Sequence, residues 1–373
     1  MPNAAAPPPR VLVLSTEAAT GSGADRLLEY FLDAARPWRE QLLVVAPEDS
    51  DVFRTARRCA FPHLAWPATR DTFGRHLLAG LTLRVPPEIG VVHAWHTRGF
   101  EPALLLGRRL GARVAASLHD HPLDSAHSAA RLRLLRLSAR RMDALVSVGE
   151  TLARAWTPFA GRVPLRVIRN GIPDAPRPAQ AAATKVRVGY AGLYSPATKG
   201  WAFVREWVRR SILEAWPVEW RLFGLTGRDP ALEKEVREIA SGAPAGSVQV
   251  AGFTPTEAIF REIDLLVHPS NTFDPYPTLL LEAARAGLPV FCSDAGGSAE
   301  IVRDGETGRV FSLAAAGDAA LRLRELIEDP AGRARMGAAA RRDYETCHAA
   351  PSMVSAYFSF WAGLAAGRAA RSD

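Results

Sequence analysis

Unbroken runs of apolar residues recur along the chain and predict buried parallel strands. The first run covers residues 10–15 and is followed by a helical stretch over residues 24–35. Strands covered by helices on both faces read as continuous apolar runs rather than as alternating ones. Further strands are expected near residues 41–46, 90–94, 113–118, 144–148 and 164–168, and then near 185–191, 218–223, 247–251, 264–267, 288–292 and 309–312. Helical segments separate most of these runs, which predicts an α/β protein with doubly wound parallel sheets.

The chain is too long for one ordinary core, and its composition shows where it divides. Residues 172–184 are rich in Pro and Ala and lack apolar periodicity, which is typical of a linker. We therefore expect a first Rossmann-like domain over residues 1–171 and a second over residues 185–350. Residues 351–373 are expected to form a C-terminal helix that packs back on the first domain. Helices are also predicted near residues 317–328, 331–342 and 350–366.

Charge and cysteine usage narrow the class of protein. The net charge of +7 comes almost entirely from Arg and favours anionic partners such as nucleotides, phosphates or an anionic membrane surface. Three widely spaced cysteines predict neither a disulfide framework nor a zinc site. The sequence also has no apolar stretch long enough for a membrane span. We expect a cytoplasmic protein, and the Arg-rich helix near residues 129–141 leaves peripheral contact with the inner face of the membrane open.

Residues 264–284 contain the most informative pattern. An apolar strand ends at Pro269, a polar loop follows, and a helix begins near Pro277, where proline suits the first turn. The free N–H groups near Thr278 and Leu279, together with the helix dipole, would form a phosphate site.

Two carboxylates flank this expected phosphate site. Asp274 lies in the loop before the helix, and Glu282 lies about one turn inside it. Both could accept hydrogen bonds from sugar hydroxyls.

This segment resembles the Glu-x7-Glu motif of family 4 glycosyltransferases, also described as glycosyl transferases group 1, which have the GT-B fold. Asp274 stands in the place of the first Glu, and the likeness continues through residues 286–290, 294–302 and 304–308. Upstream, residues 189–192, Lys199 and Gly200 resemble the donor-binding strand and loop of the family. The likeness is looser before residue 185, where it includes residues 21–23, 91–94, 117–120, 148–150 and 170–171. GT-B enzymes have two Rossmann-like domains facing a central cleft.

The resemblance implies a role for several residues. Lys199 would neutralise the donor diphosphate, Glu282 would hold the nucleotide ribose, and Asp274 would contact the donor sugar. His119, from the first domain, would face that sugar, so the catalytic residues implied are His119, Asp274 and Lys199. The donor-binding residues implied are Gly23, Gly192, Lys199, Phe253, Asp274, Tyr276, Pro277, Thr278, Leu279 and Glu282. Gly21, His96 and His121 are assigned to the acceptor side.

The activity implied is a retaining transfer of a hexosyl or N-acetylhexosaminyl group from a nucleoside diphosphate sugar. The acceptor would be a hydroxyl of a glycan, a glycolipid or a natural product, and nucleic acid is not an expected partner. The family usually needs no bound metal, so neither a metal nor another cofactor is expected. The alternatives left open are a non-catalytic sugar-nucleotide-binding protein and a GT-B nucleotide-sugar epimerase.

Two departures from the family pattern bear on activity. Leu193 occupies a position where family members often have an Arg that binds the diphosphate. Losing one such donor typically costs about 10²–10³ in rate unless another residue replaces it, and Arg26 or Arg98 could do so. Asp274 is one methylene shorter than Glu, which affects the donor sugar preference more than the activity.

Three other patterns are interpreted conservatively. Asp49, Ser50 and Asp51 match the Asp-x-Asp pattern of metal-dependent transferases, but we expect a solvated loop. The histidine pairs at 93/96 and 119/121 are expected to be structural or to face a substrate rather than to bind a metal. The glycines at 21 and 23 lack the third glycine of a dinucleotide fingerprint.

Overall fold

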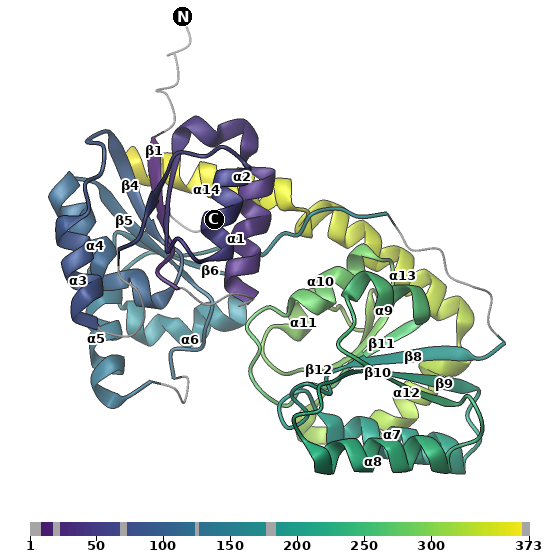
Figure 1. The fold of residues 1–373 in the computed structure, drawn as a ribbon. Coiled ribbons are helices and arrows are strands. Elements are labelled where there is room, and N and C mark those ends of the chain that lie inside the picture. Colours follow the sequence, from purple (N-terminus) through teal and green to yellow (C-terminus); the bar gives the residue numbers. More distant parts are fainter. Residues whose placement is uncertain (1–8, 18–22, 68–72, 124–126, 177–183, 368–373) are drawn as a thin grey trace, which may run out of the picture. The chain divides into compact units, whose positions relative to one another are not determined.

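The computed structural model describes residues 9–17, 23–67, 73–123, 127–176 and 184–367. The chain forms two compact units, each with its own parallel sheet between layers of helices (Figure 1). The first unit comprises Met1–Pro173 and His348–Asp373, and the second comprises Asp174–Cys347. The expected α/β class with two doubly wound sheets is confirmed.

The sheet of the first unit has seven strands in the order β3-β2-β1-β4-β5-β6-β7, and all are parallel. Its strands are β1 (Arg10–Leu14), β2 (Leu42–Ala46), β3 (His63–Ala65), β4 (Ile89–Ala94), β5 (Arg113–Leu118), β6 (Ala144–Ser147) and β7 (Leu165–Val167). Six of them coincide with the predicted apolar runs to within two residues. The seventh, β3, was not predicted because it is a short, half-buried edge strand without a strong apolar run.

Helices cover both faces of this sheet (Figure 1). α1 (Gly23–Ala34), α2 (Asp51–Arg58) and α14 (Ala350–Ala365) pack together on one face. α3 (Phe73–Thr82), α4 (Phe100–Leu110), α5 (Ala129–Ala139) and α6 (Glu150–Ala160) cover the other, with the short helices η1 (Arg36–Gln41) and η2 (Thr97–Gly99) in connections. The β-α-β crossovers all have the same handedness. Helices that follow successive strands therefore lie on one face of the sheet until the strand order reverses between β1 and β4.

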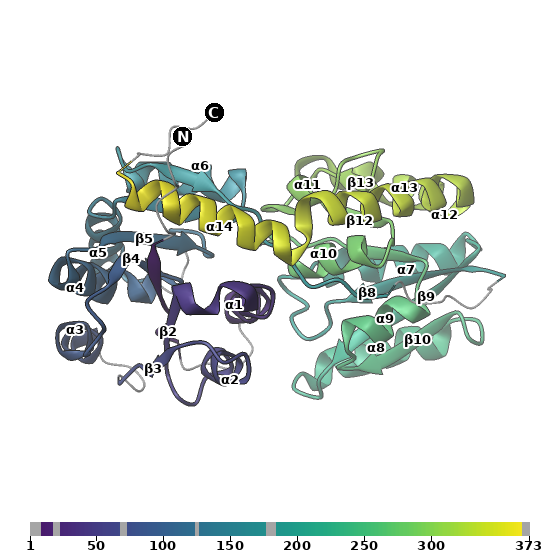
Figure 2. The same ribbon diagram turned by 90° about the horizontal axis from the view of Figure 1, so that it is seen from above.

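The C-terminal helix α14 is bound to the first unit through a buried polar chain. The Trp361 indole N–H donates to Nδ1 of His93 at 3.2 Å, and Nε2 of His93 lies 2.8 Å from Oγ of Ser117. Ser117 Oγ in turn lies 2.9 Å from the hydroxyl of Tyr357. Both ring nitrogens of His93 are therefore used within the core. The strand that carries it, β4, contacts α14, and α14 in turn lies beside α1 (Figure 2). This residue is structural rather than a metal ligand.

The boundary between the units differs from the expected linker. Ile172 is fully buried and forms a β-bridge with Ala349, its N–H donating to the carbonyl of His348 at 2.9 Å. Gly171 lies so close to this segment that a Cβ would be 2.7 Å from the Ala349 carbonyl oxygen. The first unit therefore includes Ile172 and Pro173, which we assigned to the linker, and residues from His348 onward. Residues 177–183 of the expected linker lie outside the described part of the chain.

The second unit has a six-stranded parallel sheet in the order β10-β9-β8-β11-β12-β13. Its strands are β8 (Val186–Ala191), β9 (Val218–Leu225), β10 (Val248–Gly252), β11 (Leu265–His268), β12 (Val290–Ser293) and β13 (Gly308–Phe311). α7 (Trp201–Leu213), α8 (Pro230–Gly242) and α12 (Ala319–Glu328) cover one face with an aromatic core that includes Trp207, Phe291 and Phe311. α9 (Thr256–Glu262), α10 (Thr278–Arg285) and α13 (Pro330–Asp343) cover the other, and α11 (Ser298–Ile301) follows β12 (Figure 1).

Burial of His93 predicts a pH-dependent stability for the first unit. Burial lowers the pKa of His93 to about 3, whereas an unfolded histidine titrates near 6.5. Between these values the unfolded chain binds a proton that the native chain does not, so stability falls as the pH drops below about 6.5. For this group alone we expect a loss of about 2 kcal/mol in the unfolding free energy between pH 7.5 and pH 5. Urea unfolding of the wild type and of His93→Asn at both pH values measures it. The variant should show a shallower pH dependence, and equal dependence in both proteins would contradict this assignment.

Candidate active site

The candidate residues of the second unit follow the carboxyl ends of its central strands. Lys199 lies in the connection after β8, and Asp274 lies in the connection after β11. β8 and β11 are neighbours at the point where the strand order of the sheet reverses. Open α/β sheets bind ligands at this position because the loops there diverge to opposite faces.

Lys199 and Asp274 form an ion pair. Nζ of Lys199 lies 3.1 Å from Oδ2 of Asp274, and the two side chains are 20% and 25% exposed. Both side chains keep some access to solvent, unlike those of a fully buried pair. A diphosphate or a sugar hydroxyl could therefore replace either partner, provided that neither charge is left unpaired. The sequence predicted separate ligands for these residues, and the structure brings them into contact.

The backbone of Thr198 joins the loop of Lys199 to the loop of Asp274. Its carbonyl oxygen accepts hydrogen bonds from the Ser270 hydroxyl and from the N–H of Asn271, both at 3.1 Å. Gly200 follows with a left-handed φ of 74°, and a Cβ there would lie 1.8 Å from the carbonyl oxygen of Pro269. Only glycine allows this approach.

Two further glycines hold Asp274 from the other side. Gly296 has a φ of 58°, and a Cβ on it would lie 2.1 Å from the backbone oxygen of Asp274. A Cβ on Gly297 would lie 2.0 Å from the oxygen of Pro275, and the N–H of Gly297 donates to the oxygen of Asp274 at 2.8 Å. The loop after β12 thus fixes the position of the Asp274 backbone. The sequence analysis assigned no role to these glycines, although they lie within the family-like segment.

The helix expected after Pro277 is present as α10. Pro277 is its N-cap residue and provides no side-chain cap, and Thr278 and Leu279 are half-buried in the first turn. Uncapped N–H groups at this end favour an anion. Glu282 lies one turn inside the helix and is only 4% exposed, and Tyr276 is buried as well.

Two further donor-binding candidates have contrasting environments. A Cβ on Gly192 would lie 2.4 Å from the Tyr190 ring, so this position requires glycine. Phe253, which follows β10, is 84% exposed and could offer its ring to a ligand. A ligand that covered this ring would remove apolar surface from water, which would favour binding.

Leu193 is part of the hydrophobic core. It is 2% exposed and belongs to the same cluster as Tyr190 and Trp201. A charged side chain in that place would be desolvated without a partner. The position that carries an Arg in many family members is therefore a packing position in this chain.

His268, the last residue of β11, is a buried polar residue that the sequence analysis missed. It is 4% exposed, and its Nε2 has no hydrogen-bond partner among the described residues. Burial is the main reason that its pKa falls to about 4, the charge of Lys199 lowers it further, and the charge of Asp274 opposes the shift. A histidine at the end of an apolar strand is a weak signal by itself, which is why sequence alone did not identify it.

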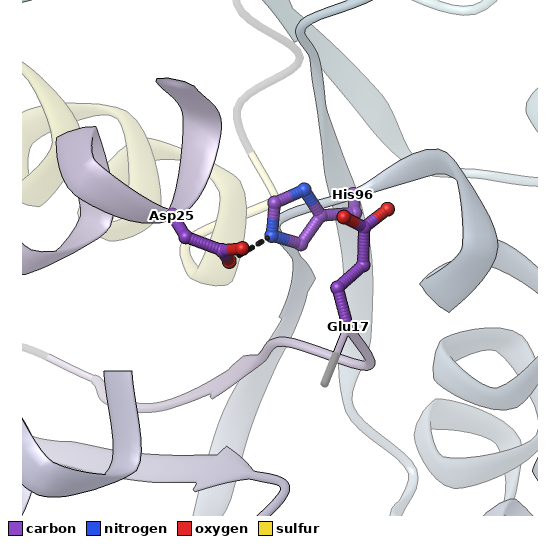
Figure 3. A group of neighbouring side chains, drawn as sticks. All are labelled: Glu17, Asp25 and His96. Carbon is purple, nitrogen blue, oxygen red and sulfur yellow. Dashed lines mark hydrogen bonds and ion pairs between the residues drawn. The ribbon is translucent and has the colours of Figure 1, made fainter. Parts of the chain in front are cut away.

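The first unit contains a second cluster, formed by Glu17, Asp25 and His96 (Figure 3). Nε2 of His96 lies 2.8 Å from Oδ1 of Asp25, and both side chains are almost fully buried. Burial acts to lower the pKa of His96, but the hydrogen bond to Asp25 and the charges of Glu17, Asp25 and Asp120 outweigh it, so the pKa is raised. One potential ligand atom from each residue lies within 4.8 Å of the others, a spacing that a cation could bridge. His96 was predicted for the acceptor side, but its two acidic neighbours were not identified.

His119 lies beside this cluster after β5. Its ring centroid is 6.1 Å from that of His96, and its Nε2 is buried without a partner among the described residues. Burial lowers the pKa of His119 well below its usual value, and the nearby His96 and His93 act in the same direction. His119 is therefore a neutral imidazole at pH 7. Of the other first-unit candidates, His121 is half-buried, Gly23 begins α1 and is exposed, and Gly21 lies outside the described residues.

The Asp-x-Asp pattern and the two arginines that could compensate for Leu193 occupy defined positions in the first unit. Ser50 caps α2, its hydroxyl accepting from the N–H of Phe53 at 3.1 Å. The expected solvated loop is therefore an exposed turn at Asp49 that leads into a helix beginning at Asp51. Arg26 donates to the hydroxyl of Tyr30 at 2.7 Å within its own helix. Arg98 is exposed on η2. Compensation for Leu193 by either residue stays a prediction.

The Arg-rich helix and the cysteines are the remaining features that the sequence analysis considered. In α5, Arg131 is used internally in an ion pair with the buried Glu101 at 2.9 Å, whereas Arg133 and Arg136 are exposed. Membrane contact through this helix stays a prediction. None of the described helices combines the length and the hydropathy that crossing a bilayer requires. All three cysteines are free thiols.

Two family models match the chain. The model of Glycosyltransferase Family 4 matches residues 21–175, and that of Glycosyl transferases group 1 matches residues 220–343. Among curated proteins, the D-inositol 3-phosphate glycosyltransferase of Rhodococcus opacus (strain B4) is 29% identical over 159 residues, which are 36% of this chain and 35% of the relative. The match thus spans about a third of the length of that relative.

Solved structures share the fold over nearly the whole chain. Anabaena HepE, crystallised with UDP-glucose, superposes with a TM-score of 0.73 at 19% identity, covering 94% of this chain and 98% of HepE. The sucrose-phosphate synthase of Thermosynechococcus elongatus superposes with a TM-score of 0.71 at 15% identity, covering 97% and 100%. At these identities the likeness concerns the fold.

The contact between Gly296 and Asp274 can be tested by adding one methyl group. In Gly296→Ala the new Cβ would overlap the backbone of Asp274 at a left-handed φ, so we expect a loss of about 2 kcal/mol or more in stability and a displaced Asp274. Gly242→Ala is the matched control, because nothing lies within 4 Å of that Cβ position. Thermal unfolding of both variants measures the effect, and an unchanged melting temperature for Gly296→Ala would contradict the contact.

Proposed function

This chain belongs to the family 4 (group 1) glycosyltransferases of GT-B fold, and we propose that it is a retaining, metal-independent hexosyl or N-acetylhexosaminyl transferase. The donor would be a nucleoside diphosphate sugar bound by the second unit. The acceptor would be a hydroxyl of a glycan, a glycolipid or a natural product bound by the first unit. The observation that carries this proposal is the exchangeable Lys199–Asp274 pair beside the uncapped end of α10.

Each residue has a proposed task in that reaction. The Lys199 ammonium and the first-turn N–H groups of α10 stabilise the negative charge that develops on the departing diphosphate. The carboxylate of Asp274 orients the sugar by accepting hydrogen bonds from its hydroxyls, and Glu282 does the same for the ribose. UDP is a candidate nucleotide because HepE was crystallised with UDP-glucose.

On the acceptor side, the neutral His119 and the Glu17–His96–Asp25 cluster supply polar groups. Glu17 is only half-buried, so its carboxylate is available to an acceptor hydroxyl, whereas His96 and Asp25 are buried and hold the cluster in shape. Peripheral membrane contact through the exposed arginines of α5 would suit a lipid-linked acceptor.

One observation favours a second candidate, a sugar-nucleotide-binding protein without transferase activity. Leu193 is a core residue, so the diphosphate site lacks the second cation that family members often have at this position. Such a protein would bind the nucleotide sugar but would not release its nucleoside diphosphate.

The first test is calorimetric binding of a panel of nucleoside diphosphates and nucleotide sugars in the presence of EDTA. We expect one nucleotide sugar and its nucleoside diphosphate to bind, because the proposed site uses protein cations and N–H groups instead of a metal. Release of the nucleoside diphosphate on incubation with candidate acceptors then separates a transferase from a mere binder. Binding that appears only when a divalent cation is added would contradict the metal-independent site.

The roles of the two charged donor-binding residues, Glu282 and Lys199, can be tested separately with matched variants. Glu282→Gln should weaken nucleoside diphosphate binding by about 1.5–3 kcal/mol, the value of a charge-assisted hydrogen bond. Lys199→Ala should depress turnover more than stability. Glu262→Gln and Lys234→Ala are controls, since both residues are exposed on neighbouring helices. Unchanged affinity in Glu282→Gln would exclude the ribose role, and unchanged turnover in Lys199→Ala would exclude Lys199 from the diphosphate site.

A further inference from the structure

Lys199 and Asp274 have tasks in the proposed reaction that compete with their ion pair. In this structure Nζ of Lys199 lies 3.1 Å from Oδ2 of Asp274. A diphosphate draws the ammonium toward its own oxygens, since it carries more negative charge than one carboxylate. Asp274 then loses its cation. Water can hydrate the carboxylate while the sugar site is empty, but a bound sugar excludes that water, and the sugar hydroxyls alone would leave a three-quarters-buried carboxylate incompletely paired.

His268 is a suitable donor already in place. Its ring is buried at the carboxyl end of β11, and Nε2 has no partner among the described residues. His268 is the last residue of β11, and Asp274 lies in the connection that follows this strand. The charges of Lys199 and of Asp274 both shift the pKa of His268, in opposite directions, which agrees with this placement. Buried side-chain nitrogens are nearly always hydrogen-bonded, and an exception points to a missing or exchanging partner.

The chemistry of the three side chains is complementary. A neutral imidazole carries one N–H donor and one acceptor nitrogen, a lysine ammonium only donates, and a carboxylate only accepts. A neutral His268 can therefore donate to Asp274 whenever Lys199 is directed elsewhere. The segment after His268 is also fixed to the Lys199 loop, because Ser270 and Asn271 both bond to the carbonyl of Thr198.

We propose that His268 is a positioning residue for Asp274: when the donor diphosphate engages Lys199, the His268 N–H donates to the Asp274 carboxylate and holds it toward the sugar. This inference rests on the proposed function and concerns the sugar half of the donor. His268 touches neither the diphosphate nor the reacting bond. Its removal should therefore affect recognition of the sugar and leave recognition of the nucleotide intact.

The test compares two affinities in the full-length protein by calorimetry, with UDP and UDP-glucose as the first probes. If the wild type binds another pair from the nucleotide panel, that pair replaces them. For His268→Leu, which has no polar side-chain atom, we expect UDP affinity within about twofold of wild type and nucleotide-sugar affinity about fivefold to tenfold weaker. His268→Gln, which keeps an N–H donor, should recover most of the loss. Asp274→Asn combined with His268→Leu should be no worse than Asp274→Asn alone, because His268 acts through Asp274.

Val267→Ala is the control for damage to the strand, since Val267 is a core residue of β11. It should lower the melting temperature without changing the ratio of the two affinities. The inference is overturned if His268→Leu, folded by thermal unfolding, leaves that ratio unchanged, or if the double variant shows additive losses. A wild type that binds no nucleotide at all would instead remove the proposed function, and this inference with it.

Discussion

The candidate donor site depends on backbone segments that approach more closely than any side chain would allow. Gly200 lies against the carbonyl of Pro269, and Gly296 and Gly297 lie against the backbone of Asp274 and Pro275. These contacts connect the loops that follow β8, β11 and β12 into one assembly. The backbone that carries Lys199 and Asp274 is therefore held in a defined position, which would suit electrostatic stabilisation of a transition state.

The two units use ion pairs of different kinds. The Lys199–Asp274 pair of the second unit is partly exposed, so ligand atoms can reach it and replace either partner. The His96–Asp25 pair of the first unit is almost fully buried, and removing one partner from such a pair would leave an uncompensated charge. The first kind suits a group that must respond to a substrate. The second kind suits a group that must keep its place.

The sequence predicted the sheets well and the site only in part. A strand such as β2 is apolar throughout because it is buried on both of its faces, so the printed sequence already shows it. Asp274 and Glu282 were identified because a proline-initiated helix begins between them. His268, and the burial of Leu193 in the core, depend on which residues meet across the fold. No local pattern indicates such contacts. The role of Ser50 as a helix cap was missed because residues 49–51 were interpreted as a solvated loop.

The path of the chain through the two units has a consequence for biosynthesis. The second unit is one continuous segment, Asp174–Cys347, whereas the first is completed only by the residues from His348 onward. A ribosome therefore releases every residue of the second unit before α14 emerges to close the polar chain that runs from Trp361 to Ser117. The unit that is translated first is thus the last to acquire all its contacts. Until then, the face of its sheet that α14 covers is exposed to solvent or to a chaperone.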